Sequence, residues 1–240
     1  FTVIDALGVK MYRNSRDCVP EQQRRIKPTR RSVSGSYAFR GHSEVQFEST
    51  LERDFIMLAD FNLSVLDIIP QPASIPFRGV NGQEYTYTPD FLVYYRLGER
   101  SYHNYPKPCL VEVKPEDDWR TNWRKWLPKW KAAYRYAQVH GWEFHIHDES
   151  RIRNQALSNI RWLSRYKNIQ FPPEETQLLI ATVNETGSMT FDHLLSRHFL
   201  GLYKAAGQAH IWHLIATRKL DCDITRPLTQ NTELWMAKYE

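Results

Sequence analysis

Two carboxylates and a lysine near the middle of the chain have the spacing of a catalytic site. Asp90 follows Pro89, and Glu112-Val113-Lys114 comes further along the chain, each set within a short β-rich run. Side chains alternate along a strand, so Glu112 and Lys114 point to the same face. If Asp90 lies on the neighbouring strand, its carboxylate, that of Glu112 and the carbonyl of Val113 can hold Mg²⁺. We therefore predict a site for phosphodiester hydrolysis, in which Lys114 orients or deprotonates the metal-bound water and offsets charge in the transition state.

Glu52 is the candidate for a third metal-binding carboxylate. It ends a Ser-Thr-Leu-Glu run that starts at Ser49, which is typical of a capping box at a helix start. The apolar positions that follow predict a helix that stops near Asn62. Glu52 therefore either joins Asp90 and Glu112 at the metal or does no more than cap this helix.

The hydrophobic pattern predicts the elements that position these residues. We expect strands over 65–69, 85–95 and 109–114, a helix around 119–137 that breaks at Pro128 and ends at Gly141, and a fourth strand over 142–147. The fourth strand should lie beside the third, reached by a crossover. The predicted fold class is α/β, with a mixed sheet flanked by helices.

The last third of the chain has a different pattern, rich in helices. We expect helices over 152–166, 173–187, from a cap at Ser188 or Thr190 to Phe199, and up to Arg218 with Ala206, His210, Leu214 and Ile215 inward. Two short strands, 220–224 and 233–236, complete the segment. The last three of these helices, followed by the β-ribbon, predict a winged helix.

Charge is concentrated near the N-terminus. The net charge is +5, while residues 10–40 hold nine Lys and Arg against two acidic residues, which is 9 − 2 = +7. A basic arm on a nearly neutral body favours phosphate binding, and a solvated tail is the alternative. The arm residues that we expect to meet nucleic acid are Arg24, Arg25, Lys27, Arg30 and Arg31.

Composition excludes several other classes of protein. No apolar stretch has the length of about 20 residues that a membrane helix needs. Three scattered cysteines, Cys18, Cys109 and Cys222, argue against a disulfide framework and a cysteine-rich zinc site. No glycine-rich phosphate loop, Ser/His/Asp set or dinucleotide fingerprint is present.

Some further side chains are weaker candidates. Lys129 and Lys131 lie on the predicted 119–137 helix and suit DNA phosphates, and Gln71 follows the first strand close to the expected site. Four tryptophans between 119 and 130 share one helical face, which favours packing over stacking on bases. His145 and His147 alternate on a strand and would chelate a metal only with a third ligand that the sequence does not supply nearby.

The order of these motifs resembles the PD-(D/E)xK nuclease core, and in detail the TnsA family. The similar runs are Leu51-Glu52-x-x-Phe55, Asp60-Phe61-x-x-x-Val65-x-x-Ile68, Gln71-Pro72, Tyr87-Thr88-Pro89-Asp90-Phe91 and Val111-Glu112-Val113-Lys114. Some members of the family carry Gln at the place of Glu112. The resemblance implies a restriction-endonuclease-like domain over 47–148, after a basic arm over 1–46, and a C-terminal winged-helix domain over 149–240.

The resemblance also implies an activity and partners. Members of the TnsA family cut the 5′ ends of cut-and-paste bacterial transposons. Because the candidate ligands are hard oxygens, we expect Mg²⁺ as the metal, with Mn²⁺ as a substitute. A DDE transposase, TnsB, cuts and joins the 3′ ends, and an AAA+ regulator, TnsC, contacts the C-terminal part. We accordingly expect a cytoplasmic, nucleoid-associated protein that binds double-stranded DNA at transposon ends and no membrane.

Two other functions remain open from the sequence. One is a stand-alone PD-(D/E)xK restriction or repair nuclease, which would need no partner protein. The other is a DNA-binding adaptor with an inactive nuclease core, against which the intact set of Glu52, Asp90, Glu112 and Lys114 argues.

Overall fold

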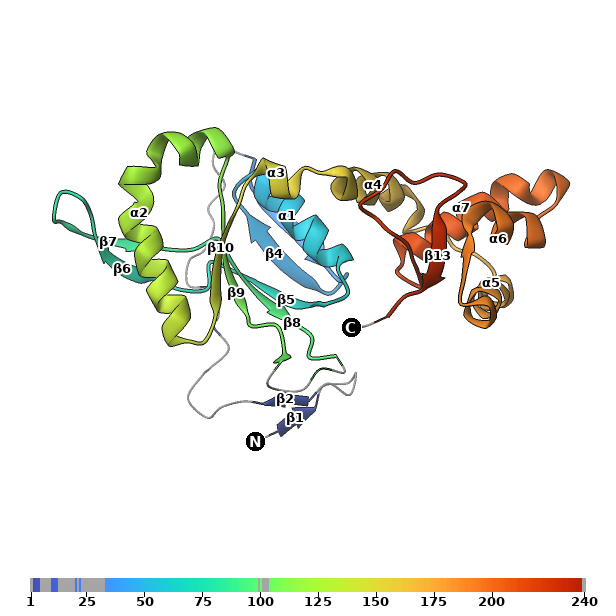
Figure 1. Cartoon of the computed structure of the whole chain (residues 1–240), viewed down its shortest axis with the longest axis horizontal. Coiled ribbons are helices and arrows are strands. Elements are labelled where there is room, and N and C mark those ends of the chain that lie inside the picture. Colours follow the sequence, from blue (N-terminus) through green and yellow to red (C-terminus); the bar gives the residue numbers. More distant parts are fainter. Residues whose placement is uncertain are drawn as a thin grey trace.

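The chain forms an elongated molecule in which a sheet flanked by helices occupies one part and a helical unit the other (Figure 1). The computed structural model describes residues 2–4, 10–12, 20, 22, 33–98, 100 and 104–238. The predicted DNA contacts Arg24, Arg25, Lys27, Arg30 and Arg31 lie outside these residues. None of the helices in the described part is long and apolar enough to cross a membrane.

The first part of the chain contains most of the strands. Its elements are β1 (Thr2–Ile4), β2 (Lys10–Tyr12), β3 (Gly35–Phe39), β4 (Ser43–Phe47), α1 (Thr50–Phe61), β5 (Val65–Pro70), β6 (Ile75–Arg78), β7 (Glu84–Tyr87), β8 (Phe91–Tyr95), β9 (Cys109–Val113), α2 (Glu116–Val139) and β10 (Glu143–His147). Strands β1–β2, β3–β4 and β6–β7 form antiparallel hairpins.

A four-stranded mixed sheet forms the centre of this part. Its order is β10-β9-β8-β5, with β9 and β10 parallel and the other pairs antiparallel. Helix α2 makes the crossover between β9 and β10, which confirms the predicted connection. All five residues of β9 are buried, as is typical of a strand with both faces covered.

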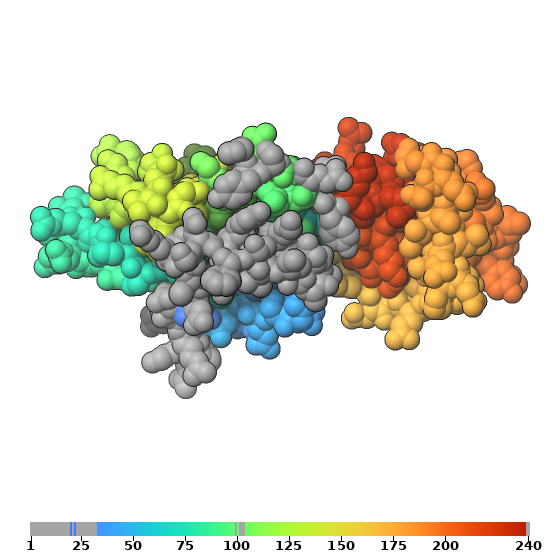
Figure 2. Space-filling model, turned by 90° about the horizontal axis from the view of Figure 1, so that it is seen from below, coloured from blue at the N-terminus to red at the C-terminus, as the bar shows by residue number. Residues whose placement is uncertain are grey.

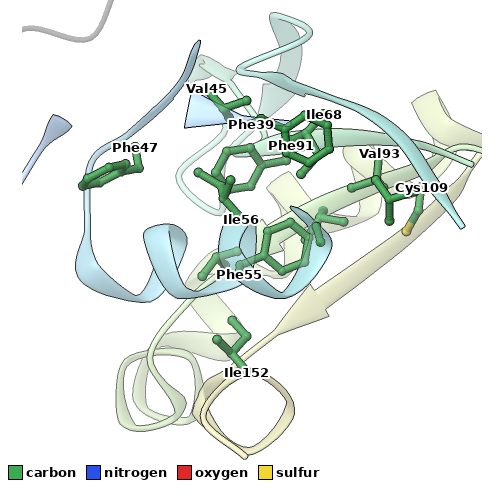
Figure 3. Close-up of a cluster of buried hydrophobic side chains, with 14 of the residues drawn as sticks. Phe39, Val45, Phe47, Phe55, Ile56, Ile68, Phe91, Val93, Cys109 and Ile152 are labelled. Carbon is green, nitrogen blue, oxygen red and sulfur yellow. The ribbon is translucent and has the colours of Figure 1, made fainter. Parts of the chain in front are cut away.

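Alternate residues of the sheet pack against helices on opposite faces. Phe91 and Val93 belong to the cluster around α1, whose Phe55 stacks on Phe91 with ring centroids 5.4 Å apart (Figure 3). Leu92, the residue between them, belongs instead to the cluster that contains Ala133 of α2. The sheet therefore lies between α1 and α2, and residues at its strand ends are fixed from both sides.

Helix α2 differs from the sequence prediction at Pro128. The expected break is wrong, because Pro128 lies inside one helix of 24 residues. Proline cannot donate to the preceding turn, so it bends a helix rather than always ending it, and Figure 1 shows that α2 changes direction along its length. The predicted end is correct, since His140 is the C-cap and Gly141 takes a φ of 71°.

The last part of the chain is mainly helical. Its elements are α3 (Glu149–Ile152), α4 (Gln155–Leu163), the 3-10 helix η2 (Ser164–Tyr166), α5 (Pro173–Thr186), β11 (Ser188–Thr190), α6 (Phe191–His198), the 3-10 helix η3 (Gly201–Tyr203), α7 (Lys204–Ala216), β12 (Leu220–Asp221) and β13 (Glu233–Met236). Strands β11, β13 and β12 form an antiparallel sheet in that order.

Three details of this part differ from the sequence prediction. The helix expected over 152–166 is divided, because Asn154 starts a new helix by accepting a hydrogen bond from the Leu157 N–H. Ala206 is exposed, whereas His210, Leu214 and Ile215 are buried as expected. Strand β11, three residues long, was not predicted.

Helices α3 and α4 connect the two parts of the chain. Ile152 is fully buried in the cluster around α1, while Leu163 of α4 belongs to the cluster of α5, α6 and α7. Asp54 of α1 is 0% exposed and accepts hydrogen bonds from Arg153 and Arg161. The space-filling view shows the C-terminal unit, in orange and red, adjoining the rest of the chain (Figure 2).

Candidate functional site

The candidate site lies where β8 begins and β9 ends. Phe91 pairs with Val111, so Asp90, one residue before β8, comes beside the end of β9. The Val113 N–H donates to Asp90 Oδ2 at 2.7 Å, and the Gln71 N–H donates to the Asp90 carbonyl at 2.8 Å. The backbone of two neighbouring strands therefore fixes Asp90 on both sides.

Glu112 is the most deeply buried member of the site, with a side chain that is 1% exposed. Its Oε1 lies 2.8 Å from Lys129 Nζ and 3.6 Å from Lys114 Nζ. Its Oε2 accepts a hydrogen bond from the Tyr87 hydroxyl. A buried carboxylate needs such partners to remain charged, and Glu112 has two ammonium groups and one hydroxyl.

Lys114 stands between the two carboxylates. Its Nζ is 3.4 Å from Asp90 Oδ2 and 3.6 Å from Glu112 Oε1. Burial lowers the pKa of the Lys114 ammonium, but the charges of Asp90, Glu112 and Glu52 outweigh this effect and raise the pKa above its ordinary value. Lys114 is therefore a fixed cation in the structure.

Asp90 is affected both by burial and by a neighbouring carboxylate. Burial, and next the charge of Glu112, raise the pKa of the Asp90 carboxyl well above its usual range, although Lys114 opposes them. The same two causes raise the pKa of Tyr87.

Glu52 serves mainly as the predicted helix cap. Its Oε2 accepts from the Glu48 N–H at 2.7 Å, its Oε1 accepts from the Ser49 hydroxyl at 2.9 Å, and its own N–H donates to Ser49 Oγ. Burial raises the pKa of Glu52, and its charge acts on Asp90 and Lys114. Glu52 thus contributes to the electrostatics of the site, while each of its oxygens accepts a hydrogen bond within the cap.

Two of the three carboxylates that the sequence suggested meet at the paired strands β8 and β9. Among the described residues, no group of three or more His, Cys, Asp or Glu side chains could hold a metal ion by itself. Asp90 and Glu112 remain, with the carbonyl of Val113. N–H and C=O of one residue in a strand point to the same edge, so this carbonyl lies on the edge whose N–H already binds Asp90. These are hard oxygen ligands, which fit Mg²⁺ or Mn²⁺.

The remaining residues that the sequence predicts to contact DNA differ in how exposed they are. Lys131 is exposed on α2. Lys129 is not on the outer surface, because its side chain is only 15% exposed and reaches Glu112. Gln71 is buried at a φ of 47°, and its Oε1 takes no hydrogen bond within the described part of the chain.

Trp126 and Trp130 of α2 and both histidines of β10 contact other aromatic rings. Trp130 is 8% exposed and Trp126 packs on it edge to face, whereas Trp123 is 45% exposed. His145 and His147 stack with ring centroids 6.3 Å apart, and His147 also contacts Phe55. Burial lowers the pKa of His147 to about 4.

Sequence reasoning missed two partners of Glu112, namely Tyr87 and Lys129. Tyr87 stands three residues before Asp90, and a tyrosine so close to a predicted carboxylate site is a signal that could have been used. Lys129 is flanked by Trp126 and Trp130, and aromatic residues one helical turn apart can enclose a lysine. The fold is needed to show that this lysine faces β9.

A mixed sheet between two helices, with Asp90, Glu112 and Lys114 at the junction of neighbouring strands, is the arrangement of the PD-(D/E)xK class of nucleases. Comparison of the sequence with models of known protein families also indicates an endonuclease. The model of the TnsA-like endonuclease N-terminal domain matches residues 62–149, and that of the TnsA endonuclease C-terminal domain matches residues 151–224. The chain therefore belongs to the TnsA endonuclease family, whose members are transposon-associated nucleases. No match is found among curated proteins.

Proposed function

We propose that this chain is a metal-dependent DNA endonuclease that hydrolyses the 5′ strands at transposon ends during cut-and-paste transposition. The observation that carries the proposal is the meeting of Asp90, Glu112 and Lys114 at the paired strands β8 and β9, in a chain of the TnsA endonuclease family. Two largely buried carboxylates around one ammonium suit a cation and a phosphate.

The oxygen donors support Mg²⁺ as the metal, with Mn²⁺ as a substitute. Asp90, Glu112 and the Val113 carbonyl would hold the ion, and Glu52 would add negative charge from α1. When bound, the ion supplies a water of lowered pKa and polarises the scissile phosphate. The binding itself would relieve the repulsion between Asp90 and Glu112.

Lys114 would act on the reacting phosphate. Its ammonium is held between the two carboxylates and is 25% exposed, so it can also reach a group that enters from solvent. A cation at this place orients the attacking water and offsets the charge that develops on the phosphate oxygens. Because water is the attacking group, no covalent bond between enzyme and DNA is expected.

A basic groove elsewhere on the sheet-containing part supports DNA binding. It lies between the β6–β7 hairpin and α2, has a volume of about 560 Å³, and includes Arg78, Arg124, Lys131 and Arg135 in its lining. Such cations would contact the phosphate backbone, which positions a duplex without reading its sequence. We propose the same role for the arm residues Arg24, Arg25, Lys27, Arg30 and Arg31, and an approach to DNA for Gln71.

Partners would complete the reaction. A TnsB-like DDE transposase would cut and join the 3′ strands, and a TnsC-like AAA+ ATPase would dock on the C-terminal unit. The order of α5, β11, α6, α7, β12 and β13 supports a winged helix in that unit. Such a unit would contact DNA, the ATPase or both.

Transposition with a dead site tests the division of labour. Asp90→Ala and Lys114→Ala should each lower 5′-strand cleavage about a hundredfold or more, while the transposase still joins the 3′ ends. Donor flanks would stay attached, so insertion junctions should shift from simple insertions to cointegrates. Simple insertions at the normal proportion would exclude a catalytic role for these residues.

In vitro nicking separates this proposal from the alternatives. Cleavage of transposon-end DNA should require Mg²⁺ or Mn²⁺ and the partner transposase. Cleavage of any duplex without the transposase would indicate a stand-alone nuclease. An absence of cleavage under every condition, with the complex assembled, would indicate an adaptor with an inactive core.

A further inference from the structure

Lys129 occupies an unusual position for a lysine on a helix. It lies in the second half of α2, yet its side chain turns inward, is 15% exposed, and places Nζ 2.8 Å from Glu112 Oε1. This is a shorter approach than either distance from Lys114 to its two carboxylates. Lys129 is thus the nearest cation to Glu112 in the described part of the chain.

Three aromatic rings enclose the Lys129 ammonium. Its Nζ lies 4.8 Å from the ring centre of Tyr87, 4.8 Å from that of Trp126 and 5.8 Å from that of Trp130. The faces of aromatic rings attract cations at such distances. The rings therefore favour the position in which the ammonium meets Glu112.

Tyr87 holds the other oxygen of the same carboxylate. Its hydroxyl donates to Glu112 Oε2, while its ring faces Lys129. The two oxygens of Glu112 therefore have separate partners, which fix the rotation of the carboxylate. Glu112 Oε1 lies 3.6 Å from Lys114 Nζ. The partners that hold Glu112 therefore also affect the position of Lys114.

Packing of α2 on the sheet does not require an ammonium at this position. Ala133 and Ala137 of α2, both 0% exposed, already provide the apolar contact with the sheet. A lysine is costly to bury unless its charge is used. The charge of Lys129 is directed at a carboxylate that the proposed function places at the metal.

We propose that Lys129, caged by Tyr87, Trp126 and Trp130, is a positioning residue that holds the Glu112 carboxylate in the orientation needed to bind the metal. This inference rests on the proposed function and deepens it. Outer partners of metal-binding carboxylates typically change metal affinity or activity 10–100-fold when removed. Lys129 is the candidate for such a partner here, and the Tyr87 hydroxyl acts on the same carboxylate.

Metal binding by the full chain tests the proposal. Mn²⁺ is titrated into wild-type protein and into Lys129→Met, Lys129→Arg and Tyr87→Phe, and the free ion is followed by its EPR signal. We expect Lys129→Met to raise the dissociation constant about tenfold or more, Tyr87→Phe to raise it by a smaller factor, and Lys129→Arg to restore part of the affinity. Single-turnover nicking at increasing Mn²⁺ should show the same order, with partial rescue at high concentration.

Controls keep the outcomes distinct. Lys125→Met removes a lysine from the exposed surface of the same helix and should leave Mn²⁺ binding unchanged. Tyr87→Phe removes a single oxygen atom, so it reports on the carboxylate even if Lys129→Met unfolds. An unchanged dissociation constant in folded Lys129→Met and in Tyr87→Phe would overturn the proposal. So would tighter binding in Lys129→Met, which would mean that the ammonium only competes with the ion.

Failure of the proposed function would look different. In that case wild-type protein would neither bind Mn²⁺ nor nick transposon-end DNA with its partner, and the inference on Lys129 would fall with it. If wild-type protein does both and the variants match it, only the inference on Lys129 is wrong.

Discussion

At the scale of single residues, Glu52 combines two roles that substitutions can separate. Its carboxylate closes the capping box with Ser49 and also adds charge near Asp90 and Lys114. Glutamine can close the same box, but it carries no charge. Glu52→Gln therefore keeps the cap, whereas Glu52→Ala removes it. Both variants remove the negative charge.

We expect Glu52→Ala to lower the free energy of unfolding by about 1 kcal/mol through the lost cap, and Glu52→Gln to lower it by less than about half of that. Both should reduce the rate of nicking about tenfold or more if the charge assists the metal. Thermal unfolding and single-turnover nicking measure the two effects. Full activity in Glu52→Gln would leave Glu52 with the cap alone.

The residues of the site were predictable because their signals are local. Asp90, Glu112 and Lys114 are recognised from their spacing and from the strands around them. The pairing of Lys129 with Glu112 was not predictable, because it depends on how α2 turns against β9. Nor does the sequence around Gln71 predict its φ of 47° or the hydrogen bond from its N–H to the Asp90 carbonyl.

At the scale of elements, α1 is the helix that links the site to the rest of the chain. Glu52 lies in its first turn, while Asp54 and Asp60 accept hydrogen bonds from Arg161 and Lys167, beyond the sheet-containing part. Burial would raise the pKa of Asp54, but hydrogen bonds from Arg161 and Arg153 outweigh it and lower the pKa. The docking of α4 thus holds the helix that carries Glu52.

This link predicts a pH dependence of stability. Because the fold lowers the pKa of Asp54, its charged carboxylate stabilises the fold above the unfolded-state pKa of about 3.9. This contribution is lost as the pH falls through the folded-state pKa. At pH 7, Asp54→Asn should lower the free energy of unfolding by about 2 kcal/mol, since the arginine partners are partly exposed. The difference from wild type should shrink below about pH 4.

Urea unfolding at several pH values measures this difference. Asp117→Asn, at an exposed carboxylate in the first turn of α2, is the matched control and should have little effect. A difference for Asp54→Asn that stays constant from pH 7 to pH 3 would contradict the role of its charge.

Elements with strong local signals were predicted well. The cap at Ser49, the buried run of β9 and the glycine at 141 fix α1, β9 and the end of α2. The failures occur where tertiary contacts decide. Pro128 stays inside α2, whose Ala133 and Ala137 pack on the sheet, and β11 pairs with β13, which lies far along the chain.

At the scale of the whole molecule, the basic arm should set the strength of DNA binding. Neutralising Arg24, Arg25, Arg30 and Arg31 together should weaken binding and flatten the dependence of log affinity on log salt by up to about 0.9 per lost phosphate contact. Fluorescence anisotropy with a transposon-end duplex at several salt concentrations measures the slope. An unchanged slope would show that the arm is a solvated tail or a protein-docking segment.

The boundary between the two parts of the chain has energetic consequences. Ile152 is fully buried against α1, and Arg153 and Arg161 neutralise Asp54. A fragment that ends after Asp148 loses Ile152, Arg153 and Arg161. Loss of one buried isoleucine and of the partners of one buried carboxylate together costs roughly 5 kcal/mol, which is comparable to the total stability of many domains.

We therefore expect the fragment 1–148 to lack a cooperative thermal transition, although it contains Asp90, Glu112 and Lys114. A fragment that ends after Lys167 retains α3, α4 and both arginines, so it should unfold cooperatively. Its midpoint should lie below that of the full chain, because Leu163 loses its contacts with the C-terminal cluster and Asn159 loses the carbonyls of Ile224 and Arg226. Circular dichroism on heating, with hydrogen exchange in α1, measures both fragments. A fragment 1–148 with the midpoint of the full chain would show that α1 and the site fold without the segment that follows.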